Sequence, residues 1–323
     1  VGAGLAPARA ARADAVALAR RARRAVALLA LLPLLGGCGG ALFGIANGAD
    51  LVNGGYVREA DLAYGAHPRQ RLDVYRPEAT ADATAPTTLV VFFHGGRWST
   101  GGKHLYRFVG AGLADRGIPV VVPNYRLYPE VRMPDAMADA AAAVAWAQAN
   151  ATRYGSAPDR VVVMGHSAGA HLAALLATDA RWLARAGGRP VRALVGLAGP
   201  YDFLPITDAD LVDYFGPPAR FAASQPVSFA GADSAPAFLA HGRDDSTVRL
   251  RNTESLAARL RAAGVPVELH LPEDDGHVAI LARFVRMNRW NDPLYAALLR
   301  FLRDPPTRTP AAPTPDVAEP AGH

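Results

Sequence analysis

Only one cysteine, Cys38, occurs among the 323 residues, and a disulfide bond within the chain is therefore excluded. The N-terminal part also lacks the roughly 20 apolar residues that a membrane-spanning helix needs. Its apolar run, residues 25–35, has the length typical of a secretion signal, so a single-pass membrane anchor is the weaker interpretation. No internal repeat is found. What the chain does have is apolar content, half of its residues, which is enough to bury a sizeable core.

An excess of positive over negative charge is also missing once the N-terminal leader is set aside. Residues 1–37 contain six arginines and a single acid, Asp14, and the rest of the chain contains 28 basic and 28 acidic residues. A nucleic-acid-binding protein needs a basic surface. The remaining chain is formally neutral, so we expect no nucleic-acid partner.

The leader has the parts of a secretory signal peptide. An arginine-rich segment ends at Arg24, the apolar run 25–35 follows, and small residues come next. The segment Leu-Gly-Gly-Cys at 35–38 resembles the lipobox of bacterial lipoproteins, in which the cysteine becomes the lipidated first residue. This resemblance implies a lipid anchor at Cys38 and a location in the bacterial cell envelope, on the periplasmic side or in the outer membrane. The alternative is that Cys38 is an incidental small residue at a signal-peptidase site, and the paired arginines leave twin-arginine export open.

Composition divides the rest of the chain. We interpret 38–55 as a tether, 56–303 as one catalytic domain, and 304–323, rich in proline, threonine and alanine, as a disordered tail. Strand-like runs alternate with helical patterns through this domain, after a first strand pair at 56–64 and 71–75. Such alternation predicts an α/β fold with a mostly parallel sheet flanked by helices. Strands are expected at 88–93, 118–122, 160–164, 191–197, 236–240 and 266–271, and helices at 104–116, 135–153, 168–180, 250–263, 278–288 and 292–303. Residues 200–231 lack a clear period and are a candidate small cap.

The strongest local signal is GHSAG at 165–169, a G-x-S-x-G motif between an expected strand and an expected helix. Glycines two residues on either side of the serine let strand and helix approach closely around a strained turn, which presents the hydroxyl above the sheet. An ordinary glycine turn is the alternative, and the strand-before, helix-after context argues against it. Ser167 is therefore the predicted nucleophile.

A second signal, HGGRW at 94–98, directly follows the expected strand 88–93. Small residues at this place let backbone N–H groups face a developing oxyanion, and the residue after the nucleophile supplies a further N–H group. We assign these donors to Gly95, Gly96 and Ala168. A glycine turn with a packed tryptophan is the alternative.

A serine nucleophile needs a histidine as general base, and the histidine needs an acid that orients it. Where the serine stands at a strand-to-helix turn, the order along the chain is serine, then acid, then histidine. His277 lies in a turn between the last expected strand and the next helix, where its side chain would stand above the carboxyl edge of the sheet. His270 lies inside a strand run, His171 inside a helix, and His241 fits a backbone-bonding role better. We therefore expect His277 to be the base, while the segment 241–248 offers two neighbouring acids, or a helix N-cap cluster.

Together, GHSAG, HGGxW, the downstream HG-x-x-D-x-x-V and the final Asp-Gly-His resemble bacterial α/β-hydrolases of the BD-FAE-like, carboxylesterase and kynurenine-formamidase-like groups. The resemblance covers about 56–303 and implies the α/β-hydrolase fold. It selects Asp245 as the orienting acid, with Asp244 as the alternative. The sequence departs from these groups at Arg97, where a small residue is common; Arg97 either lines the pocket and favours an acidic substrate or points to solvent.

The implied activity is that of a serine carboxylic ester hydrolase with a Ser167–His277–Asp245 triad and an acyl-enzyme intermediate. It requires no metal and no cofactor, and its substrate is a small-molecule ester. An amidase or formamidase on the same machinery and a binding protein that kept the fold without turnover are the alternatives. The sequence does not define the oligomeric state.

Overall fold

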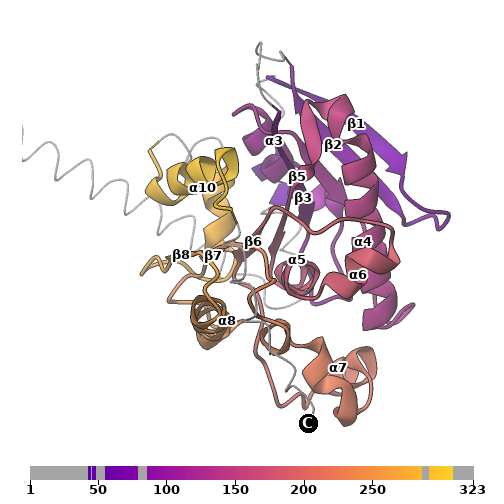
Figure 1. The fold of residues 1–323 in the computed structure, drawn as a ribbon, viewed down its shortest axis with the longest axis vertical. Helices are drawn as coiled ribbons and strands as arrows, with labels where there is room; N and C mark the ends of the chain where they lie inside the picture. Colours follow the sequence, from indigo (N-terminus) through magenta and orange to yellow (C-terminus); the bar gives the residue numbers. More distant parts are fainter. Residues whose placement is uncertain (1–42, 45, 49–54, 79–85, 286–290, 308–323) are drawn as a thin grey trace, which may run out of the picture.

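The computed structural model describes residues 43–44, 46–48, 55–78, 86–285 and 291–307. The leader, Cys38 and the tail from 308 onward lie outside these ranges. Within them, eight strands form one sheet in the order β1-β2-β4-β3-β5-β6-β7-β8 (Figure 1). The strands are β1 (Tyr56–Ala63), β2 (Arg71–Pro77), β3 (Thr87–Phe93), β4 (Val120–Pro123), β5 (Ser156–His166), β6 (Ala193–Leu197), β7 (Ala237–Ala240) and β8 (Val267–His270).

The directions of the strands match the mostly parallel sheet that the sequence predicts. β1 pairs with β2 and β2 with β4 in antiparallel orientation, and every other neighbouring pair is parallel. β3, β4 and β6 are almost entirely buried, as their continuous apolar sequences require when helices cover both faces. The prediction of a mostly parallel α/β sheet is confirmed.

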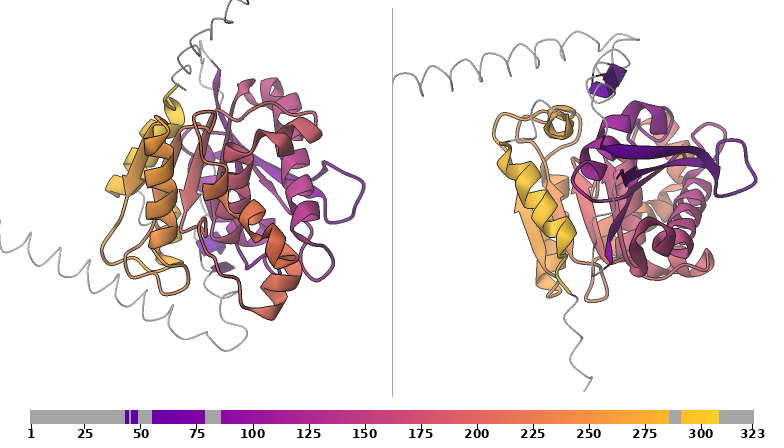
Figure 2. Two further views of the ribbon diagram at one scale, coloured as in Figure 1. Left: turned by 60° about the horizontal axis from the view of Figure 1, so that its bottom comes forward. Right: turned by 90° about the horizontal axis from the view of Figure 1, so that it is seen from above.

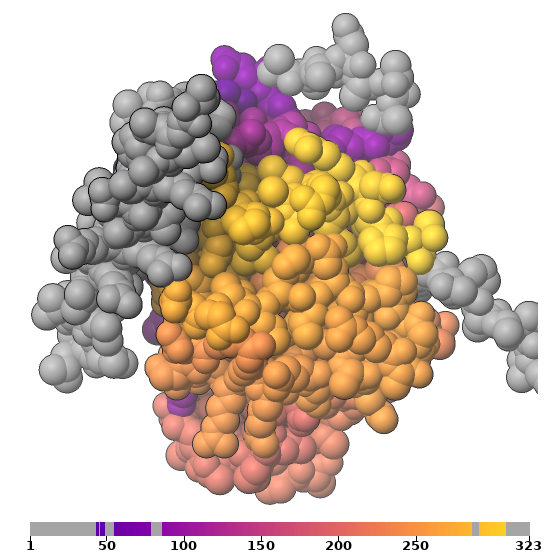
Figure 3. Space-filling model, turned by 90° about the vertical axis from the view of Figure 1, so that its left-hand side faces the viewer, coloured from indigo at the N-terminus to yellow at the C-terminus, as the bar shows by residue number. Residues whose placement is uncertain are grey.

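Helices cover both faces of the sheet (Figure 2). One buried cluster joins the sheet to α3 (Arg107–Ala114), η5 (Ala279–Phe284) and α10 (Pro293–Arg303). The other joins it to α4 (Met133–Asn150), α5 (Ala168–Thr178), α6 (Ala180–Arg185) and α8 (Arg251–Ala262). In Figure 3, which looks onto the α10 side, the C-terminal residues in orange and yellow form most of the coloured surface. The remaining short helices are η1 (Lys103–Tyr106), η2 (Ala151–Tyr154), α7 (Ala209–Phe215), η3 (Pro218–Ser224) and η4 (Pro226–Ser228).

Two of the expected helices differ most from the structure. The helix expected at 168–180 ends at Thr178, because Asp179 accepts a hydrogen bond from the Arg181 amide and so begins α6 as a separate helix. The helix expected at 278–288 is only the short 3-10 helix η5, and the backbone at Val285 is already extended, with φ −70° and ψ 134°. The buried residues Ile280, Leu281 and Phe284 gave this segment its helical pattern without a regular helix.

The segment 200–231 contains α7, η3 and η4, and α7 lies away from the sheet at the lower end of Figure 1. The segment is tied to the elbow helix α5 by His171, whose ring nitrogen Nε2 lies 2.7 Å from the carbonyl oxygen of Ser224. It also contacts the loop after β3, since the Trp98 ring lies 4.9 Å from the Phe215 ring, centroid to centroid. The segment therefore packs against the carboxyl ends of β3 and β5.

Candidate active site

Ser167 stands at the sharp turn between β5 and α5, with φ 54° and ψ −125°. A non-glycine residue rarely adopts this conformation, which costs about 1–3 kcal/mol and persists only where its surroundings enforce it. The surroundings do so here, because a Cβ on Gly169 would collide with the Phe93 carbonyl and one on Gly165 would collide with Gly169. The two motif glycines thus permit the close approach of β3, β5 and α5 that presents Ser167.

His277 connects the serine to an acid. Its Nε2 atom lies 2.9 Å from Ser167 Oγ, and its Nδ1 atom lies 2.8 Å from Asp245 Oδ2. The other carboxylate oxygen, Asp245 Oδ1, accepts the backbone N–H groups of Thr247 and Val248 at 2.8 and 2.9 Å. The structure thus brings together the three residues assigned from the sequence. The neighbouring Asp244 is exposed, and only its backbone N–H group bonds into this region, to the carbonyl of Asp275 at 3.2 Å.

The Asp245 carboxylate is held in its ionised form. Burial raises its pKa, but hydrogen bonds with His241 and His277, the positive field of His277 and the backbone N–H of Val248 together hold the pKa well below its usual range. An ionised carboxylate at this place favours the tautomer of His277 that carries its proton on Nδ1. Nε2 is then free to accept the proton of Ser167.

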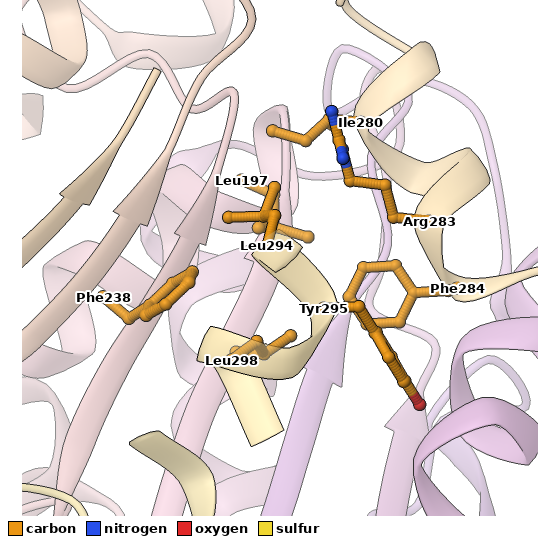
Figure 4. Close-up of a pocket in the computed structure, with 8 residues that line it drawn as sticks. All are labelled: Leu197, Phe238, Ile280, Arg283, Phe284, Leu294, Tyr295 and Leu298. Atoms are coloured by element: carbon orange, nitrogen blue, oxygen red, sulfur yellow. The ribbon is translucent and has the colours of Figure 1, made fainter. Parts of the chain in front are cut away.

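The loop that carries His277 is anchored on the α10 side of the sheet. Ile280 and Phe284 of η5 line a small apolar cavity of about 10 Å³ together with residues of β6, β7 and α10 (Figure 4). Arg283 holds both ends of the loop, because its guanidinium pairs with Asp275 at 2.7 Å and with Asp292, the N-cap of α10. The cavity holds at most about one water molecule and is not a substrate site.

The three predicted oxyanion donors differ in whether their backbone N–H groups already have a hydrogen-bond acceptor. The N–H groups of Gly96 and Ala168 make no hydrogen bond to any residue that the structure describes. Gly95, the third expected donor, already has a partner, because its N–H donates to the Tyr106 hydroxyl at 3.2 Å. The backbone N–H of Arg97, which the sequence reasoning did not consider, has no acceptor within the described ranges. The turn that aims these amides has positive φ at Gly96, Arg97 and Trp98, which the sequence does not reveal.

The Arg97 side chain does not simply point to solvent. Its guanidinium lies 2.8 Å from the carboxylate of Asp208, the N-cap residue of α7, and both side chains are about half exposed. The next residue, Trp98, is 5% exposed and packs among aromatic rings of the segment 200–231. Arg97 and Trp98 thus fasten the loop after β3 to this segment.

Three residues beside the triad were not assigned to it from the sequence. His166 Nε2 lies 2.9 Å from the carbonyl oxygen of His277, and its Nδ1 lies 3.5 Å from the Tyr106 hydroxyl. Burial, followed by the field of His277, lowers the pKa of His166 to about 3, so this ring is neutral and its Nε2–H donates. His241, expected to bond to the backbone, also lies 3.0 Å from Asp245. The only sequence signal for His166 was its place inside GHSAG, and Tyr106 had none.

Among the described residues, the side chains of the other two candidate histidines make no hydrogen bond to Ser167. His270 stacks on Phe238 and pairs with Glu268 at 2.8 Å, and His171 is fully buried against the segment 200–231. Among the residues that the structure describes, no cluster of histidine, cysteine or acidic side chains has the arrangement of a metal site. None of the described helices is both long and apolar enough to span a bilayer.

A serine at a strand-to-helix elbow, a histidine and an acid from later loops, and an eight-stranded mostly parallel sheet define the α/β-hydrolase fold with a serine-hydrolase site. The BD-FAE family model matches residues 72–260, more than half of the chain. The chain belongs to the BD-FAE family. The matched range includes Ser167 and Asp245, and His277 follows it.

Two curated relatives carry the names of ester hydrolases. The chain is 33% identical over 228 residues to the probable carboxylic ester hydrolase LipM of Mycobacterium tuberculosis, a match that covers 64% of this chain and 52% of LipM. It is 29% identical over 246 residues to a probable isoprenylcysteine alpha-carbonyl methylesterase of Oryza sativa, covering 68% of this chain and 58% of the relative. The chain thus spans little more than half the length of these relatives.

A solved structure shows the same fold. The propionate-bound esterase of Thermogutta terrifontis superposes with a TM-score of 0.60 at 23% identity, covering 76% of this chain and 92% of the other.

Proposed function

We propose that this chain is a serine carboxylic ester hydrolase that acts through an acyl-enzyme intermediate. The observation that carries the proposal is the continuous hydrogen-bonded series from Ser167 through His277 to Asp245, with contacts of 2.9 and 2.8 Å. Membership of the BD-FAE family and the ester hydrolases among the curated relatives support the same chemistry.

The reaction follows from this geometry. Ser167 Oγ attacks the ester carbonyl while His277 Nε2 takes its proton, and Asp245 stabilises the imidazolium that forms. His277 then gives the proton to the departing alkoxide, which leaves the acyl group on Ser167. A water molecule repeats the sequence on the acyl-enzyme, releases the carboxylic acid and restores the serine.

The oxyanion formed in each step needs donors that are not already bonded. We assign them to the backbone N–H groups of Gly96, Arg97 and Ala168, in place of the set with Gly95. These three amides come from the loop after β3 and from the first residue of α5, the two places from which this fold supplies them. Preorganised donors of this kind stabilise the charge that develops in the transition state.

The substrate class is a small ester, and the propionate in the solved relative supports a short acyl group. The test is labelling of the purified chain by a fluorophosphonate, followed by a panel of nitrophenyl esters of increasing acyl length, with feruloyl esters and N-formylkynurenine beside it. We expect labelling at Ser167 and fastest hydrolysis of short esters. Faster hydrolysis of N-formylkynurenine would indicate a formamidase instead, and no labelling with no turnover would indicate a binding protein.

Tyr106→Phe tests the contact behind the oxyanion loop. The change removes the acceptor of the Gly95 N–H and the hydroxyl near His166. One such hydrogen bond is worth about 1 kcal/mol, so we expect kcat for a short nitrophenyl ester to fall about fivefold. Tyr75→Phe is the matched control, because the buried Tyr75 hydroxyl makes no hydrogen bond within the described residues. Equal rates for the two variants would contradict the proposed support.

We also propose that Cys38 is lipidated and holds the protein at a membrane of the bacterial cell envelope. The support is the sequence Leu-Gly-Gly-Cys after an apolar segment, at residues outside the described ranges. We expect the expressed full chain to fractionate with membranes and a Cys38→Ser variant to be released, as measured by blotting both fractions after a carbonate wash. A Cys38→Ser variant that remains in the washed membranes would indicate a spanning segment instead.

A further inference from the structure

His241 is a fully buried histidine that the proposed mechanism does not use. It directly follows β7, and its backbone N–H donates to the carbonyl of His270 at 3.0 Å. Its side chain faces the triad acid: Nε2 lies 3.0 Å from Asp245 Oδ2 and 2.9 Å from the Val248 carbonyl oxygen. On the other side of the ring, Nδ1 lies 2.7 Å from Thr253 Oγ1. Every polar atom of this imidazole therefore has a partner.

The two atoms that face Nε2 determine where its hydrogen is. The Val248 carbonyl oxygen can only accept, and Asp245 is ionised because its pKa is held well below the usual range, by hydrogen bonds and charge that outweigh burial. A bare ring nitrogen between two acceptors would be repelled by both. Nε2 therefore carries a hydrogen, which it shares between the carbonyl and Asp245 Oδ2. This holds whether Nδ1 accepts from the Thr253 hydroxyl or donates to it.

A count of acceptor positions shows what this hydrogen adds. A carboxylate offers about four acceptor positions. Oδ1 of Asp245 accepts the backbone N–H groups of Thr247 and Val248, and Oδ2 accepts His277 Nδ1–H. His241 Nε2 lies 3.0 Å from the same Oδ2 atom, so its hydrogen is within reach of the fourth position. The side chain is completely buried, so no position is available to bulk water. With His241 in place, the carboxylate has one orientation in which all four positions are filled.

We propose that His241 is a positioning residue for catalysis, which holds Asp245 Oδ2 on His277 by donating a second hydrogen bond to the same oxygen. The proposal rests on the ester hydrolase function proposed above. Without this donor, Oδ2 has an unfilled position in a buried site, and the carboxylate can turn away from His277 to fill it. His277 then loses part of its orientation, which slows the chemical step and leaves substrate binding unchanged.

Two substitutions separate this role from simple packing. His241→Gln keeps an N–H donor near the place of Nε2, whereas His241→Asn keeps only a shorter amide that can reach Thr253 and not Asp245. A hydrogen bond to a charged group accounts for about 10- to 100-fold, so we expect His241→Asn to lower kcat by that factor with KM within about twofold. His241→Gln should recover most of the loss. His270→Gln is the matched control, because His270 pairs with Glu268 on β8 and its side chain makes no hydrogen bond to the triad among the described residues; its kcat should equal that of the unchanged chain.

The measurements are kcat and KM for one short nitrophenyl ester, a thermal melt of each variant, and the ¹⁵N spectrum of the histidine-labelled full chain. The spectrum should show His241 Nε2 protonated. An unprotonated Nε2, an equal loss in the Gln and Asn variants, or an unchanged kcat in His241→Asn would each overturn the proposal. If the unchanged chain has no esterase activity, the proposed function fails, and the spectrum still decides whether His241 donates to Asp245.

Discussion

Ser167→Ala is expected to lower hydrolysis of a short nitrophenyl ester by about 10³-fold or more while the melting temperature stays close to that of the unchanged chain. The hydroxyl is the covalent nucleophile of the proposed reaction, and among the described residues His277 is the only side chain hydrogen-bonded to it, at 2.9 Å. Removing one oxygen from the elbow leaves the backbone turn intact, so the loss should appear in kcat.

The same variant should no longer react with a fluorophosphonate. Ser228→Ala is a suitable control, because Ser228 is exposed in η4 and is outside the series of contacts around His277. Its hydrolysis rate should match that of the unchanged chain. Hydrolysis near the original rate in Ser167→Ala would show that another group attacks the ester, and the assignment of the nucleophile would then be wrong.

Asp245→Asn is expected to lower turnover by about 10³- to 10⁴-fold, because an amide at this place stabilises the wrong imidazole tautomer and cannot balance the imidazolium. The structure adds a reason for a large effect. Asp245 Oδ2 lies 2.8 Å from His277 and 3.0 Å from His241, and an Asn side chain would present an N–H group to one of these N–H donors or to the backbone amides on the other side.

Asp244→Asn provides the matched comparison one residue away. Its carboxylate is exposed, and a surface contact of this kind is worth about 1 kcal/mol of stability at most, so turnover should change by less than about twofold. Both variants are assayed with the same ester at saturating concentration, and thermal melts exclude a folding loss. A crippled Asp244→Asn beside an active Asp245→Asn would reverse the assignment of the acid.

The fold was predictable from the sequence because its signals are local. The central strands β3 and β6 are continuous apolar runs, and the helices α8 and α10 carry their own apolar period. Where prediction failed, tertiary contacts decide the outcome. The segment after His277 has helical spacing, but Arg283 ties it to Asp275 and Asp292, and only the short helix η5 forms.

In the candidate site, only the residues that stand in recognisable motifs were predictable from the sequence. Ser167 and His277 stand in motifs whose spacing has a mechanical cause, and the structure places them together. The direction of a backbone N–H group has no such sequence signal. Gly95 and Gly96 look equivalent in HGGRW, and only the position of Tyr106, eleven residues after Gly95, shows that the Gly95 amide is already bonded. Such contacts depend on how η1 packs against the sheet.

The turn at Arg97 and Trp98 has a consequence for how the substrate preference of the proposed esterase can be changed. Two consecutive non-glycine residues with φ of 53° and 60° cost about 1–2 kcal/mol each, and the contacts with the segment 200–231 offset this cost.

Loops at the carboxyl edge of a sheet are where substrate specificity usually diverges between related proteins. Here the segment 200–231, which an engineer would vary, also supports the loop after β3 and its amides that we propose bind the oxyanion. Directed evolution of this segment should therefore keep Asp208, Tyr214 and Phe215 fixed and draw its diversity from the exposed residues 217–220.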